Sequence, residues 1–210
     1  MFKKSLKTLI GSIKYFAYFA LTLTMFANTA FSATNFKLPK SYPVLYVDFT
    51  QKRIIEGLQK PIISEGFMII SIKDGLFWNQ ASPFPMTMQL TPKKMVSQVA
   101  NGPQEIITAK DNPMLFQFNH LLSALFTMNS ETIAEYFSIE SITESPKGEV
   151  ITLKPLTAPV DKIFKEIILT IQDDIHSIIL VDLQGDHTQL LFRNHEGFET
   201  LKPQDLNIFQ

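Results

Sequence analysis

Phe49 to Trp78 reads FTQKRIIEGLQKPIISEGFMIISIKDGLFW, and this run predicts the opening of a curved antiparallel sheet. It is typical of two paired strands, joined by a loop that contains Pro61 and ends near Ser64 and Gly66. Side chains alternate between the two faces of a strand. In the second strand one face would carry Met68, Ile70 and Ile72, and the other face Phe67 and Ile69. Because both faces are apolar, we expect both to be covered.

A tight turn should end the second strand at Asp74-Gly75, a dipeptide that favours two-residue hairpin turns. Leu76 to Gln80 then returns beside it, with Leu76 and the single tryptophan, Trp78, on one face. Short apolar or alternating runs separated by turn residues predict further strands along the chain. They are Val44 to Ile55, Met86 to Leu90, Met95 to Val99, Phe137 to Ser145, Glu149 to Leu153, Phe164 to Ile171, Ile175 to Val181 and His187 to Asn194. Regular spacing of this kind predicts an antiparallel meander.

Helical spacing appears in one region, Pro113 to Met128, and in a short continuation after Ser130. The apolar stripe of the first helix would contain Leu115, Phe118, Leu122 and Leu125, and that of the second Ile133, Tyr136 and Phe137. Thr34 to Pro43 contains two prolines, so an extended arm is expected there rather than a helix. Leu201 to Gln210 is expected to add only a short final turn.

The N-terminus has the layout of a secretory signal peptide. Four lysines precede an apolar run, Tyr15 to Ala27, that contains no acidic residue, and small residues follow at Ala30 and Ser32. We expect cleavage after Ser32. The alternative, a retained membrane anchor, requires about 20 apolar residues, and this run is shorter. Residues 33–210 would then form a single domain in the periplasm.

Charge and cysteine content narrow the possible partners of this domain. Without the four leader lysines, 15 basic and 20 acidic residues remain, a net charge of −5. An acidic balance argues against nucleic acid or an anionic membrane as the main partner. The chain has no cysteine, so neither a disulfide nor a lipid-modified cysteine is available, and the core must hold the fold.

Motifs for catalysis or metal binding are missing. The eight glycines form no Gly-x-Ser-x-Gly, GxGxxG or Walker pattern. His195 to Glu199 superficially resembles a zinc-protease helix, but Glu199 replaces the second histidine and Gly197 disfavours a helix, so we interpret this segment as a loop. Five acidic and histidine residues near two consecutive turns are interpreted as turn-stabilising and solvated side chains rather than metal ligands. They are Asp174, His176, Asp182, Asp186 and His187.

Several single residues resemble the periplasmic lipoprotein carriers of the LolA type. Phe49, Gln51, Gly66 and Trp78, followed by Pro83 or Pro85, resemble the opening of that family. Leu58, Pro61, Ser64, Gly66 and Gly75-Leu76-x-Trp78 resemble more closely a divergent LolA-like branch. The Asp182-x-x-Gly185 turn followed by Phe192 resembles the closing region. The resemblance therefore runs from about Phe49 to Asn194.

The resemblance implies a mainly β fold: an incomplete antiparallel β-barrel, or strongly curved sheet, covered by a short helical lid. It further implies a carrier that receives cargo from an inner-membrane exporter, shields the acyl chains in an apolar cavity, and delivers cargo to an outer-membrane acceptor. LolA-type carriers have an Arg before a Pro, ahead of the tryptophan, that is important for lid closure. Here Ser71-Ile72-Lys73-Asp74 occupies that stretch, and Lys73 offers a point charge instead of a planar fork. A lipid or lipid-linked product therefore fits as cargo as well as a lipoprotein does.

We accordingly hypothesise a monomeric carrier without catalytic residues, cofactor or metal. Methionine and phenylalanine make adaptable walls for flexible chains, and an apolar surplus of these types suggests an acyl-chain cavity. The candidate lining residues are Phe67, Ile69, Trp78, Met86, Met88, Leu115, Phe118 and Leu122. Strand parity alone does not show which face is concave. Two alternatives stay open: a non-catalytic envelope-assembly adaptor with a solid core, and a hydrolase of lipid conjugates with Ser, His and Asp brought from distant strands.

Overall fold

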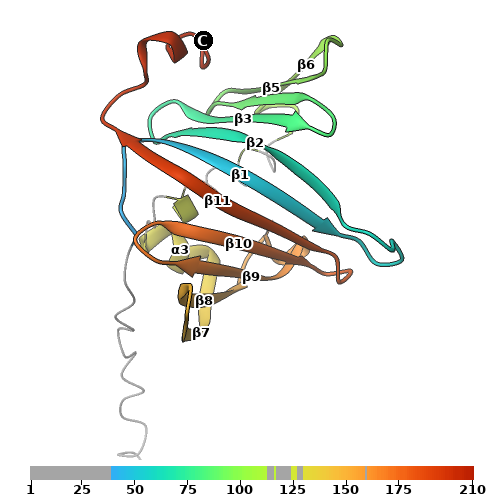
Figure 1. Cartoon of the computed structure of the whole chain (residues 1–210), viewed down its shortest axis with the longest axis vertical. Helices are drawn as coiled ribbons and strands as arrows, with labels where there is room; N and C mark the ends of the chain where they lie inside the picture. Colours follow the sequence, from blue (N-terminus) through green and yellow to red (C-terminus); the bar gives the residue numbers. More distant parts are fainter. Residues whose placement is uncertain (1–38, 113–115, 117–123, 127–129, 159) are drawn as a thin grey trace, which may run out of the picture. The chain divides into compact units, whose positions relative to one another are not determined.

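A single antiparallel sheet organises the described part of the chain (Figure 1). The computed structural model describes residues 39–112, 116, 124–126, 130–158 and 160–210. These residues belong to one compact unit, Phe36–Gln210. The predicted signal peptide, and most of the predicted helix from Pro113 to Met128, lie outside the described residues.

Eleven strands pair in the order β6-β5-β4-β3-β2-β1-β11-β10-β9-β8-β7. Their bounds are β1 Val44–Ile54, β2 Ile62–Ser71, β3 Gly75–Ser82, β4 Met86–Leu90, β5 Lys94–Val99, β6 Gln104–Thr108, β7 Phe137–Ser145, β8 Gly148–Pro155, β9 Phe164–Ile171, β10 Ile175–Asp182 and β11 His187–Phe198. Two meanders, β1 to β6 and β7 to β11, are joined where the first strand pairs with the last, from Val44↔Phe198 to Ile54↔His187. β6 and β7 are the two ends of the order, so the sheet is not closed. The predicted incomplete barrel is confirmed.

The predicted strands are confirmed, with corrections at several ends. β2 begins at Ile62, earlier than expected, and β6 was not predicted. The predicted loop at His195 to Glu199 is wrong, because β11 continues to Phe198 and pairs there with the start of β1. A side chain at Gly197 would overlap the Tyr42 ring, so the glycine is explained by this close packing. The β2–β3 turn has three residues, Ile72 to Asp74, because Ser71 pairs with Gly75.

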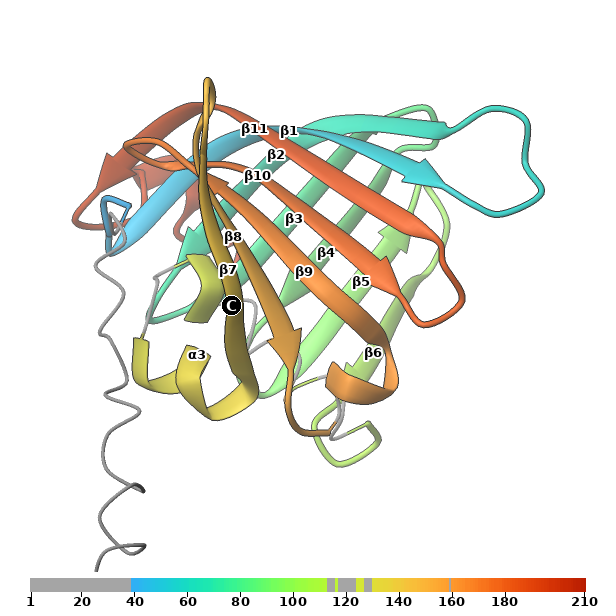
Figure 2. The same cartoon turned by 90° about the horizontal axis from the view of Figure 1, so that it is seen from below.

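The two faces of the sheet are covered by different segments. On the inner face, a core cluster joins strand residues such as Val47, Met68 and Phe192 to Leu125 and Ile133 of the helical segments. Figure 2 shows α3 (Ser130–Tyr136) on the inner side of the curved sheet. The helical cover over an open barrel therefore agrees with the expected fold. None of the described helices is long and apolar enough to cross a bilayer.

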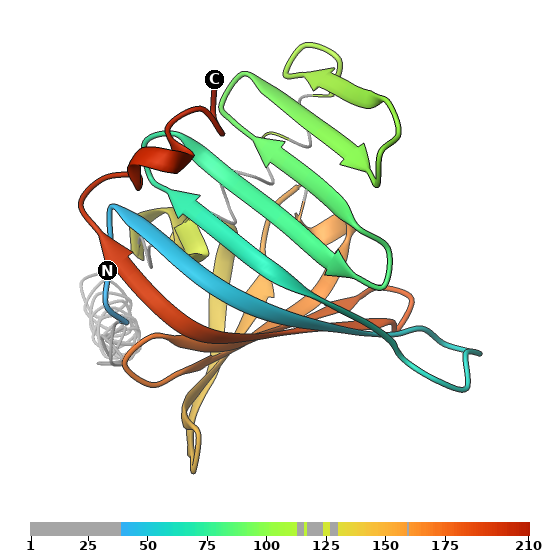
Figure 3. The same cartoon turned by 45° about the horizontal axis from the view of Figure 1, so that its top comes forward.

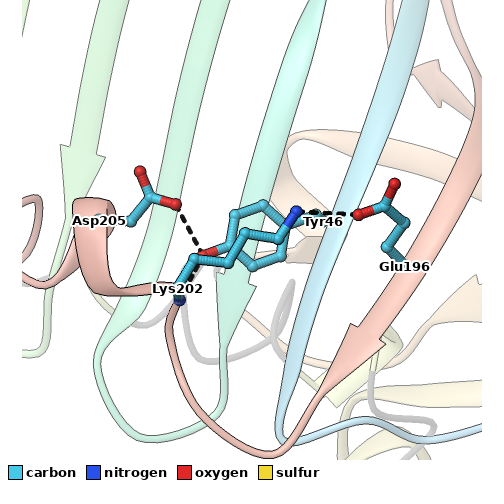
Figure 4. A network of polar contacts seen from close by, with 4 residues as sticks. All are labelled: Tyr46, Glu196, Lys202 and Asp205. Atoms are coloured by element: carbon cyan, nitrogen blue, oxygen red, sulfur yellow. Dashed lines mark hydrogen bonds and ion pairs between the residues drawn. The ribbon is translucent and has the colours of Figure 1, made fainter.

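The C-terminal segment packs on the outer face, where Figure 3 shows it in front of the sheet. It contains a short 3-10 turn, η2 (Pro203–Asp205). The hydroxyl of Tyr46 donates a hydrogen bond to Asp205 Oδ2 (2.9 Å) and accepts one from the backbone N–H of Lys202 (3.0 Å) (Figure 4). Lys202 Nζ lies 4.3 Å from the centre of the Tyr46 ring and 2.9 Å from Glu196 Oε2. These contacts anchor the final turn that was expected at the C-terminus.

Candidate functional site

The inner face carries a continuous apolar row that crosses several strands. In one row Val47 pairs with Met68, Met68 with Trp78, and Trp78 with Met88. The next row contains Leu76, Leu90 and Met95. Cross-strand neighbours on one face of a sheet lie in contact, so these side chains form one surface.

Part of this surface is only half covered. We call Trp78, Met86, Met88, Met95 and Val99 the Met–Trp strip; they lie on the inner face of β3, β4 and β5. Val99 is 60% exposed and the other four side chains are half-buried. Trp78, Met88 and Met95 also pack against the buried core cluster. The strip is therefore an apolar surface that is continuous with the core and reached by solvent.

The other half of the inner face is solid. Side chains of β8, β9 and β10, such as Ile151, Leu169 and Ile178, are at most 1% exposed. Phe126 packs edge-on against Phe192, with ring centres 5.4 Å apart. The cavity beside Phe126, bounded also by Leu45, Val47 and Ile175, measures only about 10 Å³, at most the space of one water molecule. This half of the face offers no room for an acyl chain near Phe126.

Trp78 stands at the border between the two halves. Its ring lies 3.9 Å, centre to centre, from that of Phe49 on β1. Its indole Nε1 is buried and has no hydrogen-bond partner among the residues that the structure describes. A buried N–H without an acceptor costs about 1–3 kcal/mol, so the fold keeps an unsatisfied donor next to the exposed apolar surface.

The predicted lining residues do not all gather on one face. Trp78, Met86 and Met88 lie together in the Met–Trp strip. Phe67 and Ile69 flank Met68 along β2 and point to the outer face, so they cannot line the same surface as Trp78. Leu115, Phe118 and Leu122 lie outside the described residues. The prediction had no means of choosing between the faces, because β2 is apolar on both.

Sequence reasoning missed three inner-face residues: Phe49, Met95 and Val99. Phe49 stacks on Trp78, and Met95 and Val99 extend the strip onto β5. The sequence alone showed that these residues lie at even spacing from other apolar residues in their strands. What the sequence lacked was the register, which places Met86 opposite Val99 and Leu90 opposite Met95.

The polar groups that could have indicated a metal site act in turns. Asp182 Oδ1 accepts hydrogen bonds from the backbone N–H groups of Gln184 and Asp186. Asp186 Oδ1 accepts one from the backbone N–H of Glu56. The interpretation of these two aspartates as turn residues is confirmed. Among the described residues, no group of three or more His, Cys, Asp or Glu side chains could hold a metal ion.

Lys73, the residue in place of the family's arginine, is exposed in the β2–β3 turn. It borders an outer-face pocket of about 590 Å³ between that turn, the start of β1 and the C-terminal segment. The neighbours of Lys73 in the turn are tied to each other, since the Ser71 hydroxyl donates to Asp74 Oδ2 (2.8 Å). Lys73 thus lies in a turn of the sheet and on the rim of the outer-face pocket.

An open antiparallel barrel with an apolar inner face and helical cover defines a class of proteins that enclose apolar ligands. Residues 41–208 match the family described as outer membrane lipoprotein carrier protein LolA. The chain belongs to this family, as the resemblance of its opening strands had indicated. No relative was found among curated protein sequences.

Solved structures with a similar arrangement share very little sequence with the chain. A LolA superfamily protein from Nitrosomonas europaea is 6% identical, with a TM-score of 0.45 over 80% of this chain and 92% of that one. A putative outer membrane lipoprotein-sorting protein domain from Vibrio parahaemolyticus is 9% identical, with a TM-score of 0.45 over 81% and 92% of the two chains. A DUF1329 family protein from Desulfovibrio piger is 8% identical, with a TM-score of 0.45 over 81% and 93%. The family assignment rests on the match over residues 41–208.

Proposed function

We propose that this protein is a periplasmic carrier that binds the acyl chains of a lipoprotein or lipid-linked product and moves it from the inner to the outer membrane. The signal peptide, residues 1–32, is removed on export, and residues 33–210 work as one domain. The carrier acts as a monomer and performs no covalent chemistry. Its cargo passes from an inner-membrane exporter to an outer-membrane acceptor, as the resemblance to LolA-type carriers implies; the family name itself names an outer membrane lipoprotein carrier.

The observation that supports this proposal best is the half-covered Met–Trp strip. Each methylene group transferred from water to an apolar surface contributes about 0.8 kcal/mol, so one long acyl chain on the strip is enough for a stable complex. Methionine side chains adapt to flexible ligands, which suits a carrier whose cargo has no fixed shape. The packed half of the inner face would hold the fold while the strip exchanges ligand.

The unsatisfied indole N–H of Trp78 supports the same location. A carbonyl oxygen of an ester or amide-linked acyl chain is a suitable acceptor, and it would reach this buried donor only once the side chains that cover the N–H move aside. A hydrogen bond from the Trp78 indole N–H to this carbonyl oxygen would remove the free-energy cost of the unpaired N–H. We therefore place the polar end of the chain near Trp78 and its tail along Met88 and Met95.

A second candidate function is an envelope-assembly adaptor whose interior is solid and whose exposed apolar side chains contact a partner protein. The observation that favours it is the tight packing beside Phe126, where only about 10 Å³ is free. On this account the Met–Trp strip would be a protein-binding surface.

Organic extraction of the purified protein followed by mass spectrometry distinguishes the two functions. A carrier should release a lipid in an amount comparable to the protein, and Met88→Gln should reduce that amount. Phe67→Gln, a matched change on the outer face, should not. Extraction that yields no lipid from the parent protein, together with no binding of added fatty acid, would favour the adaptor.

A further inference from the structure

The β1–β2 hairpin extends beyond the neighbouring turns of the sheet (Figures 2 and 3). It carries exposed apolar side chains. We call residues 52–63 the β1–β2 tip. Ile54 is 45% exposed, Leu58 53%, Ile62 43% and Ile63 52%. Single exposed apolar residues are common, but a group of four at one protruding end is not, and such groups mark binding surfaces.

The tip is a hydrogen-bonded hairpin, so the exposure of its apolar side chains does not result from an unfolded segment. Lys52 pairs with Ile63 and Arg53 with Ile62 across the hairpin. The N–H of Leu58 donates to the carbonyl of Ile55 (3.1 Å), which closes the turn. The N–H of Glu56 donates to Asp186 Oδ1 (2.9 Å), which ties the tip to the β10–β11 turn.

The neighbouring turn continues the apolar surface. Leu183 is 58% exposed in the β10–β11 turn, and its N–H donates to the carbonyl of Ile163, which is 37% exposed. Apolar side chains from two hydrogen-bonded turns therefore lie at one end of the sheet. A ligand that contacts this end meets the tip first, because the hairpin protrudes furthest (Figure 2).

The net charge of the tip is opposite in sign to that of residues 39–210 as a whole. Five of the 19 basic residues precede Pro39, so residues 39–210 carry 14 basic and 20 acidic residues. Within the tip the balance reverses: Lys52, Arg53 and Lys60 outnumber Glu56. No ion pair in the described part of the chain involves these three cations. The tip has a net charge of 3 − 1 = +2 and lies next to Asp182 and Asp186 of the β10–β11 turn, so the three cations of the tip itself, rather than the whole end, would attract an anionic surface.

We propose that the β1–β2 tip inserts into the headgroup region of an anionic phospholipid bilayer. Insertion of apolar side chains combined with basic residues near the lipid phosphates is the physical basis of reversible interfacial binding. A protruding tip suits a bilayer better than a protein partner, because interfacial insertion needs only a few exposed apolar side chains, whereas a specific protein interface buries about 800 Å² on each partner. This binding does not depend on the proposed cargo function, since the tip and the Met–Trp strip share no residue.

Vesicle flotation tests the proposal, with the protein purified from cells in the form in which it accumulates there. The probes are vesicles of phosphatidylglycerol with phosphatidylethanolamine, and neutral vesicles of phosphatidylcholine. Two double variants change the tip. Leu58→Ser with Ile63→Ser removes two apolar side chains, and Arg53→Gln with Lys60→Gln removes two cations. The control is Ile72→Ser with Lys73→Gln, which changes an equally exposed isoleucine and a lysine at the opposite end of β2.

The parent should float with anionic vesicles, and binding should weaken strongly at about 1 M salt, where the screening length falls to about 3 Å. Each lost cation should weaken binding by about fivefold, and loss of the two apolar side chains by about tenfold or more. The control should bind like the parent. All variants should keep the parent's melting temperature and its binding of free fatty acid, because the changed residues are exposed and outside the strip.

Three outcomes would overturn the proposal. The parent could stay in solution with anionic vesicles, or the tip variants could bind as the parent does, or the control could lose binding as much as they do. A photo-crosslinker at position 58 that labels a protein in cells, without vesicle binding in vitro, would make the tip a protein-docking surface instead. Loss of fatty-acid binding with intact vesicle binding would contradict the proposed function and leave the bilayer proposal standing.

Discussion

Met88 on β4 and Phe67 on β2 are two apolar residues, one on each side of β3 in the strand order, that face opposite ways. Met88 pairs with Trp78 on the inner face, and Phe67 pairs with Asn79 on the outer face. We predict that Met88→Gln weakens fatty-acid binding by about tenfold, because a buried amide next to an acyl chain costs about 1–3 kcal/mol. Phe67→Gln should leave binding unchanged. Trp78 fluorescence during fatty-acid titration measures both, and equal effects of the two changes would contradict the assignment of faces.

Gly66 is explained by the close approach of β3. A side chain at this position would overlap the backbone carbonyl oxygen of Asn79. Gly66→Ala should therefore destabilise the protein by about 2 kcal/mol or more, because backbone has to move. Gly57→Ala is the control: φ is +85° there, but nothing lies within 4 Å of the new carbon, so the cost should be only about 1 kcal/mol. Chemical denaturation of both variants measures the difference, and a smaller effect at Gly66 than at Gly57 would contradict this explanation.

At the scale of single residues, the sequence showed which apolar residues the strands contain. It did not show which face of the sheet each side chain is on. It predicted the apolar surplus of Trp78, Met86 and Met88, because methionine and tryptophan in alternating strands are visible without a structure. It could not separate Phe67 and Ile69 from them. Ile69 is 1% exposed although it faces outward. A residue on the covered outer face has the same pattern as a core residue, and only the register distinguishes the two.

The C-terminal segment is an element whose attachment depends on one hydroxyl. The pKa of Tyr46 is raised by its burial and by the Asp205 carboxylate, and the N–H of Lys202 opposes this. The neutral phenol is the form that donates to Asp205, so its contribution is complete below the ordinary pKa of about 10 and is lost as pH rises through the raised value. We predict that the protection factors for amide exchange in residues 201–210, which correct for the intrinsic rise of exchange with pH, are constant up to about pH 9 and fall above about pH 10.

Tyr46→Phe provides the comparison for this prediction. It removes two hydrogen bonds, worth about 1 kcal/mol each, and should accelerate exchange in the same residues already at neutral pH. Tyr42→Phe changes another tyrosine outside the segment and should leave exchange as in the parent. If the Tyr46 variant exchanges at the parent's rate, the segment is held by its apolar contacts instead.

Elements were predicted better than their connections. Turn residues such as Pro146-Lys147-Gly148 divide the chain into strands, and β9 has the bounds that its pattern predicted. β6 was missed because its five residues are mostly polar and exposed. The extension of β11 was missed because pairing with β1 overrides the low strand preference of Gly197. The contact between first and last strands is long-range, and local sequence patterns do not encode it.

In the described part of the molecule, one sheet combines a tightly packed half with a half whose inner face is partly exposed. Strands β8 to β10 contribute side chains with almost no exposure, whereas β3 to β5 expose the Met–Trp strip. A carrier needs both, since the fold must persist while the ligand enters and leaves. The resemblance to LolA-type carriers indicated the incomplete barrel with its helical cover, but not this division into two halves. Which half exposes apolar side chains on the inner face became visible only with the register and the burial of each side chain.

Photo-crosslinking tests this division most directly. The purified protein is irradiated with a photoactivatable fatty acid, and modified peptides are mapped by mass spectrometry, with excess unlabelled fatty acid as the competition control. The account predicts competed labels on Trp78, Met86, Met88, Met95 or Val99. Labels confined to outer-face residues such as Phe67 and Phe77, or no competed label at all, would contradict it.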